Sequence, residues 1–238
     1  MKHSSVTNIR DITQESQPIE KNATRLALIK AAMKIFGRDG YAAASTRAIA
    51  DEAKVNQALI NYHFSTKQGL YLAVFKYIST FIQAGAGEKL AEIETALNAQ
   101  KNQSREFYWQ SITQLMNGML HMINSDETTE WSNLIIREQQ RPTEAFSILE
   151  NGAHGHLRKV LTRLVAGIFA IEAESEKAKL TAITLMGQIL MFKVARATVL
   201  TGMQWEAIEE SELMKIKRVI FSNYASILGC EDLLGDTV

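Results

Sequence analysis

The chain has 238 residues, 46% of them hydrophobic, and its 26 Lys and Arg balance its 26 Asp and Glu, so the formal net charge is zero. This length allows one large domain or two small ones, and the hydrophobic fraction is sufficient for a buried core. Cys230 is the single cysteine, which excludes an intramolecular disulfide, and nothing in the composition indicates an oxidising compartment.

Charge is unevenly distributed along the chain. Residues 1–80 carry 11 Lys and Arg against 6 Asp and Glu, whereas the remaining 158 residues carry 15 against 20. A basic front and an acidic rear are typical of a nucleic-acid-binding head on a body that does not bind nucleic acid. Chance segregation of charge gives the same pattern.

The sequence predicts an all-α protein. Only two prolines, Pro18 and Pro142, interrupt it, and strand-like alternation is nearly absent, which favours long helices. The longest uncharged apolar run, Leu180–Phe192, has 13 residues and is too short to span a bilayer. The N-terminus lacks the apolar core of a signal peptide. We therefore expect a cytoplasmic protein that does not bind a membrane.

The N-terminal residues 1–22 are polar and lack a periodic pattern, so we expect a mobile arm there. The first firm helix is predicted over Thr24–Asp39, because apolar residues recur at helical spacing. These residues are Leu26, Ile29, Met33 and Phe36. Gly40 follows as a stop signal for this helix.

The next stretch, Ser45–Lys67, predicts two short helices joined by a tight turn at residues 54–56. Ser45 or Thr46 would cap the first helix, and Asn56 would cap the second, predicted over residues 57–63. Such a pair fits a helix-turn-helix whose second helix enters the major groove of DNA. Two short helices with polar surfaces also occur in ordinary helical proteins, and spacing alone leaves both interpretations open.

The polar side chains of this stretch are suited to contacts with duplex DNA. Cationic and hydroxyl groups bind phosphates, whereas amides on the second helix can bind base edges. The residues predicted to contact DNA are Thr46, Arg47, Gln57, Ala58, Asn61, Tyr62, His63 and Lys67. We expect Gln57, Ala58 and Asn61 to face bases and the others to contact the backbone.

A longer pattern runs through the same residues. Thr-x-x-x-Ile-Ala-x-x-Ala begins at Thr46, and after a turn Tyr-x-Phe-x-x-Lys follows from Tyr62. This block resembles the N-terminal domain of TetR-family transcriptional regulators, and the similarity extends from about residue 24 to residue 81. Lys54 replaces the usual turn glycine, so it needs either a different turn or a left-handed backbone, which costs a non-glycine residue about 1 kcal/mol.

Two further departures lie in the second helix of this block. Asn56 stands where the family frequently has Ser, and Ala58 stands where it frequently has Gly or Pro. Both substitutions keep helix capping and a close approach to DNA feasible. The resemblance implies an N-terminal three-helix DNA-binding domain over residues 23–68 and a helical ligand-binding and dimerisation bundle over residues 69–238.

After the helix-turn-helix, a fourth helix is predicted to begin with a capping box formed by Ser65 and Gln68. We expect Gly85 and Gly87 to end this helix and a separate helix to follow over residues 88–100. In the resembled family the fourth helix connects the DNA-binding head to the body.

Late in the chain, two long helices have wide apolar faces. They are predicted over Leu180–Thr201 and Ser211–Leu228. We expect them to form a homodimer interface as a four-helix bundle, although the same faces could instead fill an intramolecular core.

Large and adaptable side chains in the rear of the chain predict a pocket for a small-molecule effector between the helices. The residues predicted to line or orient it are Trp109, Met116, Met119, Trp131, Arg137, Phe146, Met186 and Arg196. Methionines and aromatic residues at helical spacing also fill ordinary cores, and that alternative stays open.

Motifs of catalysis or metal binding are not evident. His154 and His156 lie two residues apart beside glycines, which favours a solvated loop over a metal site. We find no phosphate-binding glycine loop, Gly-x-Ser-x-Gly or His-Glu-x-x-His. We therefore expect no enzyme activity, no cofactor and no metal.

The segment Ile136–Phe146 contains Arg-Glu, a short spacer and Pro-Thr-x-Ala-Phe. It resembles a stretch of the CecR-like branch of the TetR family, which is associated with control of drug efflux and antibiotic sensitivity. The resemblance implies a repressor that a small hydrophobic effector releases from a palindromic DNA operator. Two alternatives are a helical enzyme or carrier with a merely structural helix-turn-helix, and a regulator without a small-molecule effector.

Overall fold

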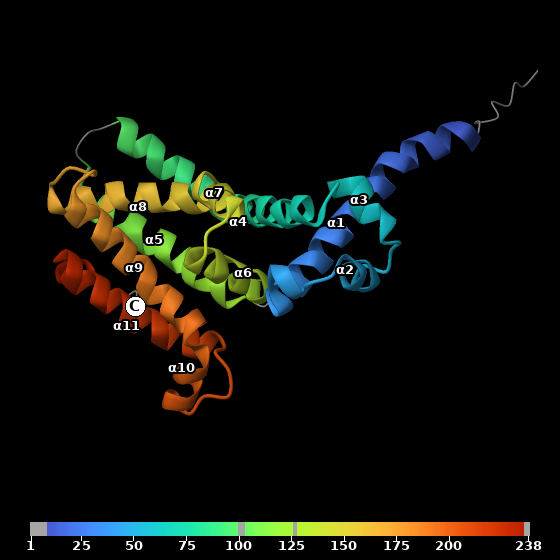
Figure 1. The fold of residues 1–238 in the computed structure, drawn as a ribbon. Helices are drawn as coiled ribbons and strands as arrows, with labels where there is room; N and C mark the ends of the chain where they lie inside the picture. The colour runs from blue at the N-terminus through green and yellow to red at the C-terminus, as the bar shows by residue number, and fades with distance from the viewer. Residues whose placement is uncertain (1–8, 100–102, 126–127, 236–238) are drawn as a thin grey trace, which may run out of the picture. The chain divides into compact units, whose positions relative to one another are not determined.

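The computed structural model describes residues 9–99, 103–125 and 128–235, with side chains described from residue 21 onward except at residue 129. In this part of the chain the structure contains helices and no strand, which confirms the predicted all-α class (Figure 1). The helices are α1 (Ile9–Ala43), α2 (Thr46–Glu52), α3 (Ala58–Phe64), α4 (Lys67–Ala99), α5 (Arg105–Asn124), α6 (Thr129–Gln140), α7 (Glu144–Glu150), α8 (Ala153–Phe169), α9 (Glu176–Val194), α10 (Arg196–Met203) and α11 (Glu210–Leu228), followed by the short 3-10 helix η2 (Glu231–Leu233).

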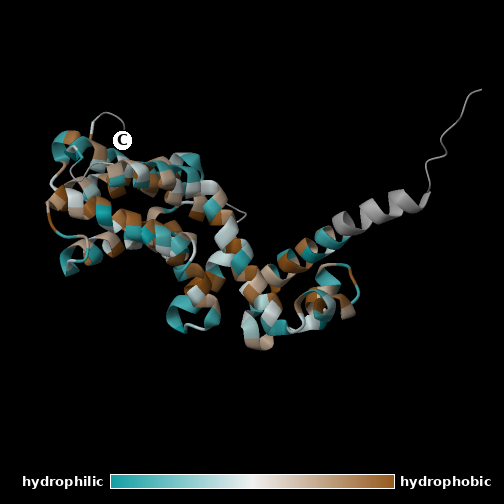
Figure 2. Ribbon diagram, turned by 90° about the horizontal axis from the view of Figure 1, so that it is seen from above, coloured by the Kyte–Doolittle hydropathy of each residue, from teal (hydrophilic) through white to brown (hydrophobic). Residues whose placement is uncertain are grey.

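These helices form two compact units. Unit 1 comprises the described residues up to Ile78 together with Asn133–Phe146, and unit 2 comprises Ser79–Ser132 and the described residues from Ser147 onward. In both units hydrophobic and hydrophilic residues alternate around the helices (Figure 2). The division differs from the predicted domain boundary after residue 68, because a segment far along the chain belongs to unit 1.

Helix α1 begins earlier than the sequence predicts. Residues 1–8 of the expected arm lie outside the described residues, and residues 9–22 are helical. Adding residues to an existing helix requires no new nucleus, so a polar segment can continue a helix without a periodic pattern. Gly40 interrupts α1 at φ 79° and ψ 165°, a backbone conformation that glycine adopts without a steric penalty.

The core of unit 1 joins its first four helices. Fully buried side chains come from α1, α2, α3 and the first turns of α4: Leu28, Phe36, Ile49, Ile60, Leu70 and Phe75. Phe36 and Tyr71 meet edge to face with ring centroids 5.1 Å apart. Each such fully buried side chain stabilises the fold by about 1.5–3 kcal/mol. The helix-turn-helix is therefore stabilised by a shared hydrophobic core with α1 and α4.

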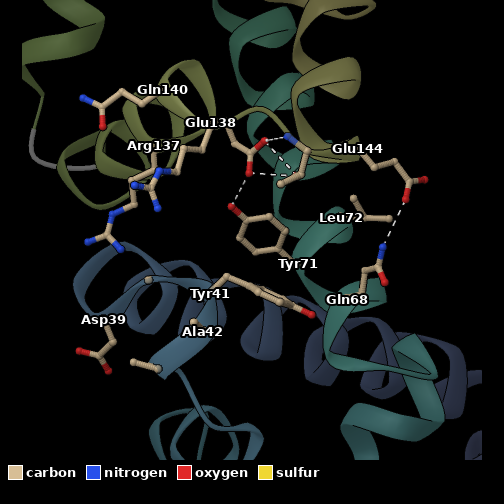
Figure 3. A pocket seen from close by; sticks show the side chains of 14 residues that line it. Asp39, Tyr41, Ala42, Gln68, Tyr71, Leu72, Arg137, Glu138, Gln140 and Glu144 are labelled. Carbon is tan, nitrogen blue, oxygen red and sulfur yellow. Dashed lines mark hydrogen bonds between the residues drawn. The ribbon is translucent and has the colours of Figure 1, made fainter.

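A buried carboxylate attaches the end of α6 to unit 1. Glu138 is 3% exposed and accepts hydrogen bonds from the Tyr71 hydroxyl at 2.8 Å, the Thr143 backbone N–H at 2.8 Å and the Thr143 hydroxyl at 3.0 Å (Figure 3). A buried charge is costly unless it is hydrogen-bonded, so these contacts fix α4, α6 and the loop before α7 together. Burial and the bond to Glu138 raise the pKa of Tyr71.

Helix α4 does not end at Gly85 and Gly87 as predicted, but continues to Ala99. A glycine inside a helix costs only about 1 kcal/mol relative to alanine, and Leu90 and Ile93 are buried beyond the glycines. Apolar packing therefore outweighs the local stop signal.

The start of α4 has a single capping bond at Thr66 in place of the predicted capping box of Ser65 and Gln68. Ser65 has φ 64° and ends α3, so it is not available as the cap of the next helix. Instead the Thr66 hydroxyl oxygen accepts a hydrogen bond from the Gly69 N–H at 2.9 Å. A Cβ at residue 69 would collide with the backbone carbonyl of Phe64, so only glycine allows α3 and α4 to approach this closely.

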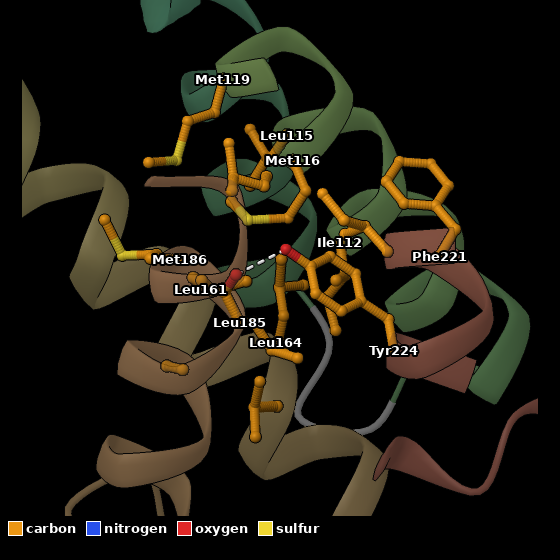
Figure 4. Packing of buried hydrophobic residues seen from close by; sticks show 14 of the residues in the cluster. Ile112, Leu115, Met116, Met119, Leu161, Leu164, Leu185, Met186, Phe221 and Tyr224 are labelled. Atoms are coloured by element: carbon orange, nitrogen blue, oxygen red, sulfur yellow. Dashed lines mark hydrogen bonds between the residues drawn. The ribbon is translucent and has the colours of Figure 1, made fainter. Parts of the chain in front are cut away.

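In unit 2, helices α5, α8, α9 and α11 pack around one apolar cluster. Figure 4 shows its centre, which includes Ile112, Leu115, Met116, Met119, Leu161, Leu164, Leu185, Met186, Phe221 and Tyr224. The Tyr224 hydroxyl donates to the Leu185 carbonyl at 2.5 Å, which satisfies the polar group in this apolar core. Burial raises the pKa of Tyr224.

The predicted helix Leu180–Thr201 is broken in the structure. Helix α9 ends at Val194, Ala195 leaves helical geometry at φ −100° and ψ 29°, and α10 then runs at 73° to α9. The break lets the chain return so that Trp205 and Ile208 pack against the cluster of unit 2, a tertiary contact that carries no local stop signal. Helix α11 begins at Glu210 and ends at Leu228, which confirms the last predicted helix.

Within the described residues, no single helix is both long enough and apolar enough to cross a bilayer. The bent pair α9 and α10 meets the criteria of length and composition only when its two arms are counted as one span.

Candidate nucleic-acid interface

The two helices of the helix-turn-helix are capped as their sequence predicts. The Ser45 hydroxyl oxygen accepts a hydrogen bond from the Ala48 N–H at 3.0 Å, which caps α2. The Asn56 side-chain oxygen accepts one from the Ala58 N–H at 2.8 Å at the start of α3. Both bonds satisfy amides that have no partner within the helix.

The turn between these helices follows the left-handed alternative. Lys54 has φ 57°, and its N–H donates to the Asp51 carbonyl at 3.1 Å. The Val55 N–H donates to the Ala50 carbonyl at 3.0 Å, and Val55 is half-buried. The turn therefore keeps its hydrogen bonds without glycine, at a local backbone cost of about 1 kcal/mol.

Helix α3 buries one side and exposes the other. Ile60 and Phe64 are buried, whereas Ala58, Asn61 and Tyr62 are exposed, Tyr62 to 64%. The geometry presents one polar side of α3 to an external partner, as recognition by a helix in a groove requires.

Gln57 lies just before α3, and a hydrogen bond orients it. Its amide N–H donates to the Thr46 hydroxyl oxygen at 2.8 Å, so the starts of α2 and α3 are joined. The amide oxygen of Gln57 takes no part in this bond and can accept from an external donor. Thr46, predicted to contact the DNA backbone, and Gln57, predicted to contact bases, are therefore joined by a hydrogen bond.

Two cations of α1 flank the exposed side of α3. The Lys21 ammonium lies 4.9 Å from the centroid of the Tyr62 ring, and the Arg25 guanidinium lies 5.3 Å from that of Phe64. Burial first, and then repulsion by these two cations, lowers the pKa of His63. Arg25 is absent from the predicted set. Its spacing of four residues from Lys21, which places both on one side of a helix, is the signal that would have identified it.

The remaining predicted cations differ in their surroundings. Arg47 is largely exposed and lies 4.0 Å from Asp51. Lys67 is half-buried, with its ammonium 4.6 Å from the centroid of the Tyr41 ring and 3.5 Å from the Ala42 carbonyl oxygen. Its contact with DNA phosphate stays a prediction, because these internal contacts already bind the ammonium.

The residues predicted to bind an effector are divided between the units. Trp109, Met116, Met119 and Met186 are buried in the apolar cluster of unit 2, and Trp131 is buried with its ring 6.3 Å from that of Phe81. Arg196 is half-buried at the start of α10. Arg137 and Phe146 belong to unit 1. The eight residues thus belong to two different units, and their role stays a prediction.

The two histidines expected in a loop lie instead within α8. His156 pairs with Glu94 at 2.9 Å, and His154 is half-buried. The glycines on either side do not prevent a helix, because Gly155 packs so closely on the carbonyl of Glu150 that a side chain there would collide with it. Among the described residues no three His, Cys, Asp or Glu side chains are grouped as metal ligands.

Comparison with known proteins identifies the family. Residues 28–74 match the family model described as bacterial regulatory proteins, tetR family, and residues 109–230 match that of the C-terminal domain of the HTH-type transcriptional dual regulator CecR. The chain is 32% identical over 213 residues to the HTH-type transcriptional dual regulator CecR of Shigella flexneri, covering 88% of this chain and 93% of that protein. The chain belongs to the CecR branch of the TetR family. Both resemblances noted in the sequence are thereby confirmed.

Other TetR-family and regulatory proteins share part of the sequence or the fold. The HTH-type transcriptional repressor NicS of Pseudomonas putida is 35% identical over 81 residues, which are 33% of this chain and 38% of NicS. A TetR transcription regulator from Haloarcula marismortui has a TM-score of 0.55 at 19% identity and covers 86% of this chain and 97% of its own. A TetR-like transcriptional regulator from Rhodococcus sp. RHA1 has a TM-score of 0.55 at 17% identity, with coverages of 87% and 96%.

The structural likenesses show the fold, and the sequence matches show the family. This TetR-family protein is therefore a DNA-binding transcription regulator with a helix-turn-helix. The curated relatives in sequence reported above are transcription regulators.

Proposed function

We propose that this protein is a dimeric repressor that leaves a near-palindromic operator when a small effector binds, and that its targets include drug efflux genes. The observation that carries the DNA-binding part is the exposed polar side of α3. It combines Asn61 and Tyr62 with a capped, oriented helix start and with cations on α1. We infer that α3 enters the major groove, with Gln57, Ala58 and Asn61 at the bases.

The dimer is proposed from an apolar surface on α9 and α11. Leu180, Ile183 and Val194 on α9 are 58%, 52% and 59% exposed, and Val219 on α11 is 58% exposed. A set of exposed apolar side chains on adjoining helices marks an interaction site. We infer that two copies pair through these helices, so that two α3 helices meet half-sites about 34–36 Å apart or a multiple of that spacing.

Repression, effector release and efflux control rest on the family branch and on the named relatives. The Shigella flexneri relative is a dual regulator and the Pseudomonas putida relative is a repressor by name. An effector shifts an equilibrium between two states only through its difference in affinity for them, and a shift from 1:99 to 99:1 takes about 5.5 kcal/mol. The effector must therefore contact a part of the chain that changes when DNA is released.

Fluorescence anisotropy with labelled duplexes tests this proposal. One duplex carries the DNA beside the protein's own gene, and the other has a scrambled sequence of equal length. We expect tighter binding of the first duplex and a linear fall of the logarithm of affinity with the logarithm of salt concentration. Equal affinity for both duplexes at every salt concentration would contradict the proposal.

Two variants separate sequence reading from backbone contact. Asn61→Ala should reduce the preference for the operator by about tenfold, because one base contact contributes about 1–3 kcal/mol of discrimination. Tyr62→Ala should weaken binding to both duplexes by a similar factor and leave the preference unchanged. If Asn61→Ala loses affinity equally on both duplexes, α3 does not read bases through that residue.

A further inference from the structure

Unit 1 contains a cavity of about 730 Å³, within the range of small-molecule sites (Figure 3). One wall is the backbone of residues 40–43, which leads into α2. A second wall is the first turns of α4, with Tyr71 and Leu72. The third is the end of α6 and the following loop, with Arg137 and Arg141. The segment that resembles the CecR branch thus forms one side of a cavity, next to the helix-turn-helix.

The apolar part of this cavity is aromatic. Tyr41 is 41% exposed, and its ring centroid lies 4.9 Å from that of the buried Tyr71 at an angle of 61°. Leu72 adds an aliphatic surface beside them. A partly exposed tyrosine ring on a fixed aromatic neighbour is a rigid surface for a planar ring, because aromatic pairs gain energy beyond the area they bury.

The acidic groups of the cavity wall are already occupied to different degrees. Glu138 accepts three hydrogen bonds within the chain. Asp39 accepts two from the Arg38 guanidinium at 2.7 and 2.9 Å, which lowers the pKa of Asp39. Glu144, beside Gln68, accepts one long bond of 3.4 Å. Asp39 is therefore paired with a guanidinium, Glu138 is held by hydrogen bonds from neutral donors within the chain, and Glu144 lies on the side of the cavity formed by Gln68.

The basic groups retain unused donors. Arg137 reaches the carbonyl oxygens of Gly37 and Arg38 only at 3.4 and 3.5 Å, the long limit of a hydrogen bond. Arg141 is exposed, and its side chain makes no hydrogen bond or ion pair with any residue that the structure describes. A guanidinium has five donors in a planar fork that matches a carboxylate. The strongest unused binding capacity in this cavity is thus for an anion.

We propose that this cavity binds a planar aromatic carboxylate, with the ring against Tyr41 and the carboxylate on Arg137 and Arg141. Glu144 repels a carboxylate from the opposite side, so it fixes the direction in which the ligand lies. This site is separate from the core residues of unit 2 that the sequence suggested for an effector, and Arg137 is the predicted residue that the two sets share.

A ligand here would act directly on the DNA-binding helices, an extension that rests on the proposed function. Tyr41 holds the Lys67 ammonium against its ring, and Lys67 also donates to the carbonyl of Ala42 in the cavity wall. Residues 40–43 lead into α2, and Lys67 begins α4 directly after α3. A ring bound to Tyr41 therefore changes the position of Lys67 and of both segments that flank the helix-turn-helix.

Isothermal titration calorimetry with three probes of one shape tests the site on the full chain. The probes are 2-naphthoate, the neutral 2-naphthamide and the cationic 2-naphthylmethylammonium. We expect 2-naphthoate to bind about tenfold or more tightly than the amide, as charge-assisted hydrogen bonds to a guanidinium imply. Equal affinities, tighter binding of the cation, or no binding of 2-naphthoate would each overturn the proposal.

Matched variants locate the binding. Arg141→Gln should weaken 2-naphthoate binding by about tenfold, and its fold should be intact because the side chain has no partner among the described residues. Arg163→Gln, which removes a half-exposed guanidinium of unit 2, should retain the affinity of the unaltered protein. If Arg141→Gln binds 2-naphthoate as tightly as the unaltered protein, the site is wrongly assigned.

A DNA titration separates this proposal from the proposed function. We expect saturating 2-naphthoate to weaken operator binding in the unaltered protein and to weaken it less in Arg141→Gln, compared as the ratio of affinities with and without the probe. If the unaltered protein without any probe shows no preference for the operator duplex, the proposed function is refuted. Calorimetry would still show whether the cavity binds the probe. Arginine-dependent binding that leaves operator affinity unchanged would support the site and overturn its link to DNA release.

Discussion

Units 1 and 2 expose opposite kinds of surface. Unit 1 presents a polar side of α3 with Asn61 and Tyr62, flanked by cations of α1. Unit 2 presents an apolar strip on α9 and α11, with more than half of the Ile183 and Val219 side chains exposed. Exposed polar groups are free to form directional contacts with a charged duplex, whereas exposed apolar groups gain energy by leaving water. The difference supports the two proposed partners, DNA for unit 1 and a second copy of the chain for unit 2.

The interiors of the two units also differ, with a polar group at the centre of unit 1 and a mainly apolar cluster in unit 2. A buried carboxylate with three hydrogen bonds connects α4, α6 and the α7 loop in unit 1. The cluster of unit 2 is apolar apart from groups such as the Tyr224 hydroxyl, which is satisfied by a backbone carbonyl. Hydrogen bonds restrict geometry more strictly than apolar contacts do. Unit 1 is thus organised by specific bonds close to the helices that must fit DNA, and unit 2 by apolar volume.

The largest effect is expected from a charge placed on the apolar strip. Val219→Glu would bury a carboxylate and its symmetry mate in the proposed dimer interface. We expect the dimer to weaken by about a thousandfold, or about 4 kcal/mol, because buried unpaired charges are strongly unfavourable. Sedimentation equilibrium measures the dissociation constant directly. Operator affinity should fall with it, because two half-sites are then no longer bound together.

A control for this variant places the same charge elsewhere. Ala91→Glu alters an exposed residue of α4 that lies outside the strip, and it should leave the dimer unchanged. If both variants shift the association equilibrium equally, the effect reflects net charge and not the strip on α9 and α11.

A second effect is expected inside unit 1. Glu138→Met removes the acceptor of one buried hydrogen bond, from Tyr71, and of two part-buried ones, from the backbone and hydroxyl of Thr143. We expect the free energy of unfolding to fall by about 3 kcal/mol, because each buried donor without a partner costs about 1–3 kcal/mol. Urea denaturation followed by circular dichroism measures this change. Glu92→Gln, at an exposed pair with Lys89, should change stability by at most about 0.5 kcal/mol.

Local sequence signals predicted the helix-turn-helix well. Ser45 and Asn56 cap their helices, Gly40 interrupts α1, and Lys54 takes the left-handed conformation, one of the two alternatives that its place in the turn left open. These features depend on short hydrogen bonds and backbone preferences within a few residues. Such signals are visible in the sequence because no distant contact competes with them.

Predictions from local sequence signals were wrong where contacts between distant residues decide the position of a helix end. Gly85 and Gly87 do not end α4, because burial of Leu90 and Ile93 outweighs their helix propensity. The break at Ala195 has no local stop signal, and Trp205, ten residues farther on, packs against the cluster of unit 2. Four of the predicted effector residues, Trp109, Met116, Met119 and Met186, lie in the apolar cluster of unit 2, and their role stays a prediction. A cavity depends on which segments meet, as residues 40–43 and 137–144 do, and no pattern in the sequence reveals that meeting.

A third, smaller effect concerns the bond that joins α2 and α3. Thr46→Val removes the acceptor of the Gln57 amide while keeping the side chain's shape. We expect operator preference to fall by about 1 kcal/mol, because the amide is then no longer held in place for a base. A double-mutant cycle with Gln57→Ala on operator and scrambled duplexes measures the coupling. Additivity within about 0.3 kcal/mol would show that the two residues act independently and that the bond does not orient Gln57.

The smallest effect is on the protonation of His63, the titratable group between α3 and the cations of α1. Burial, then Lys21 and Arg25, lowers its pKa from 6.5. A histidine whose pKa is lower in the folded state stabilises the fold fully above pH 6.5, and this contribution is lost as pH falls through the folded pKa.

Arg25→Gln should raise the pKa of His63, as should bound DNA, because phosphates favour the protonated ring. NMR titration of the His63 ring measures both shifts, with Lys89→Gln in unit 2 as the variant expected to cause none. If operator DNA leaves the pKa of His63 unchanged while Arg25→Gln raises it, the phosphates do not approach this side of α3, and the polar surface of unit 1 has a different partner.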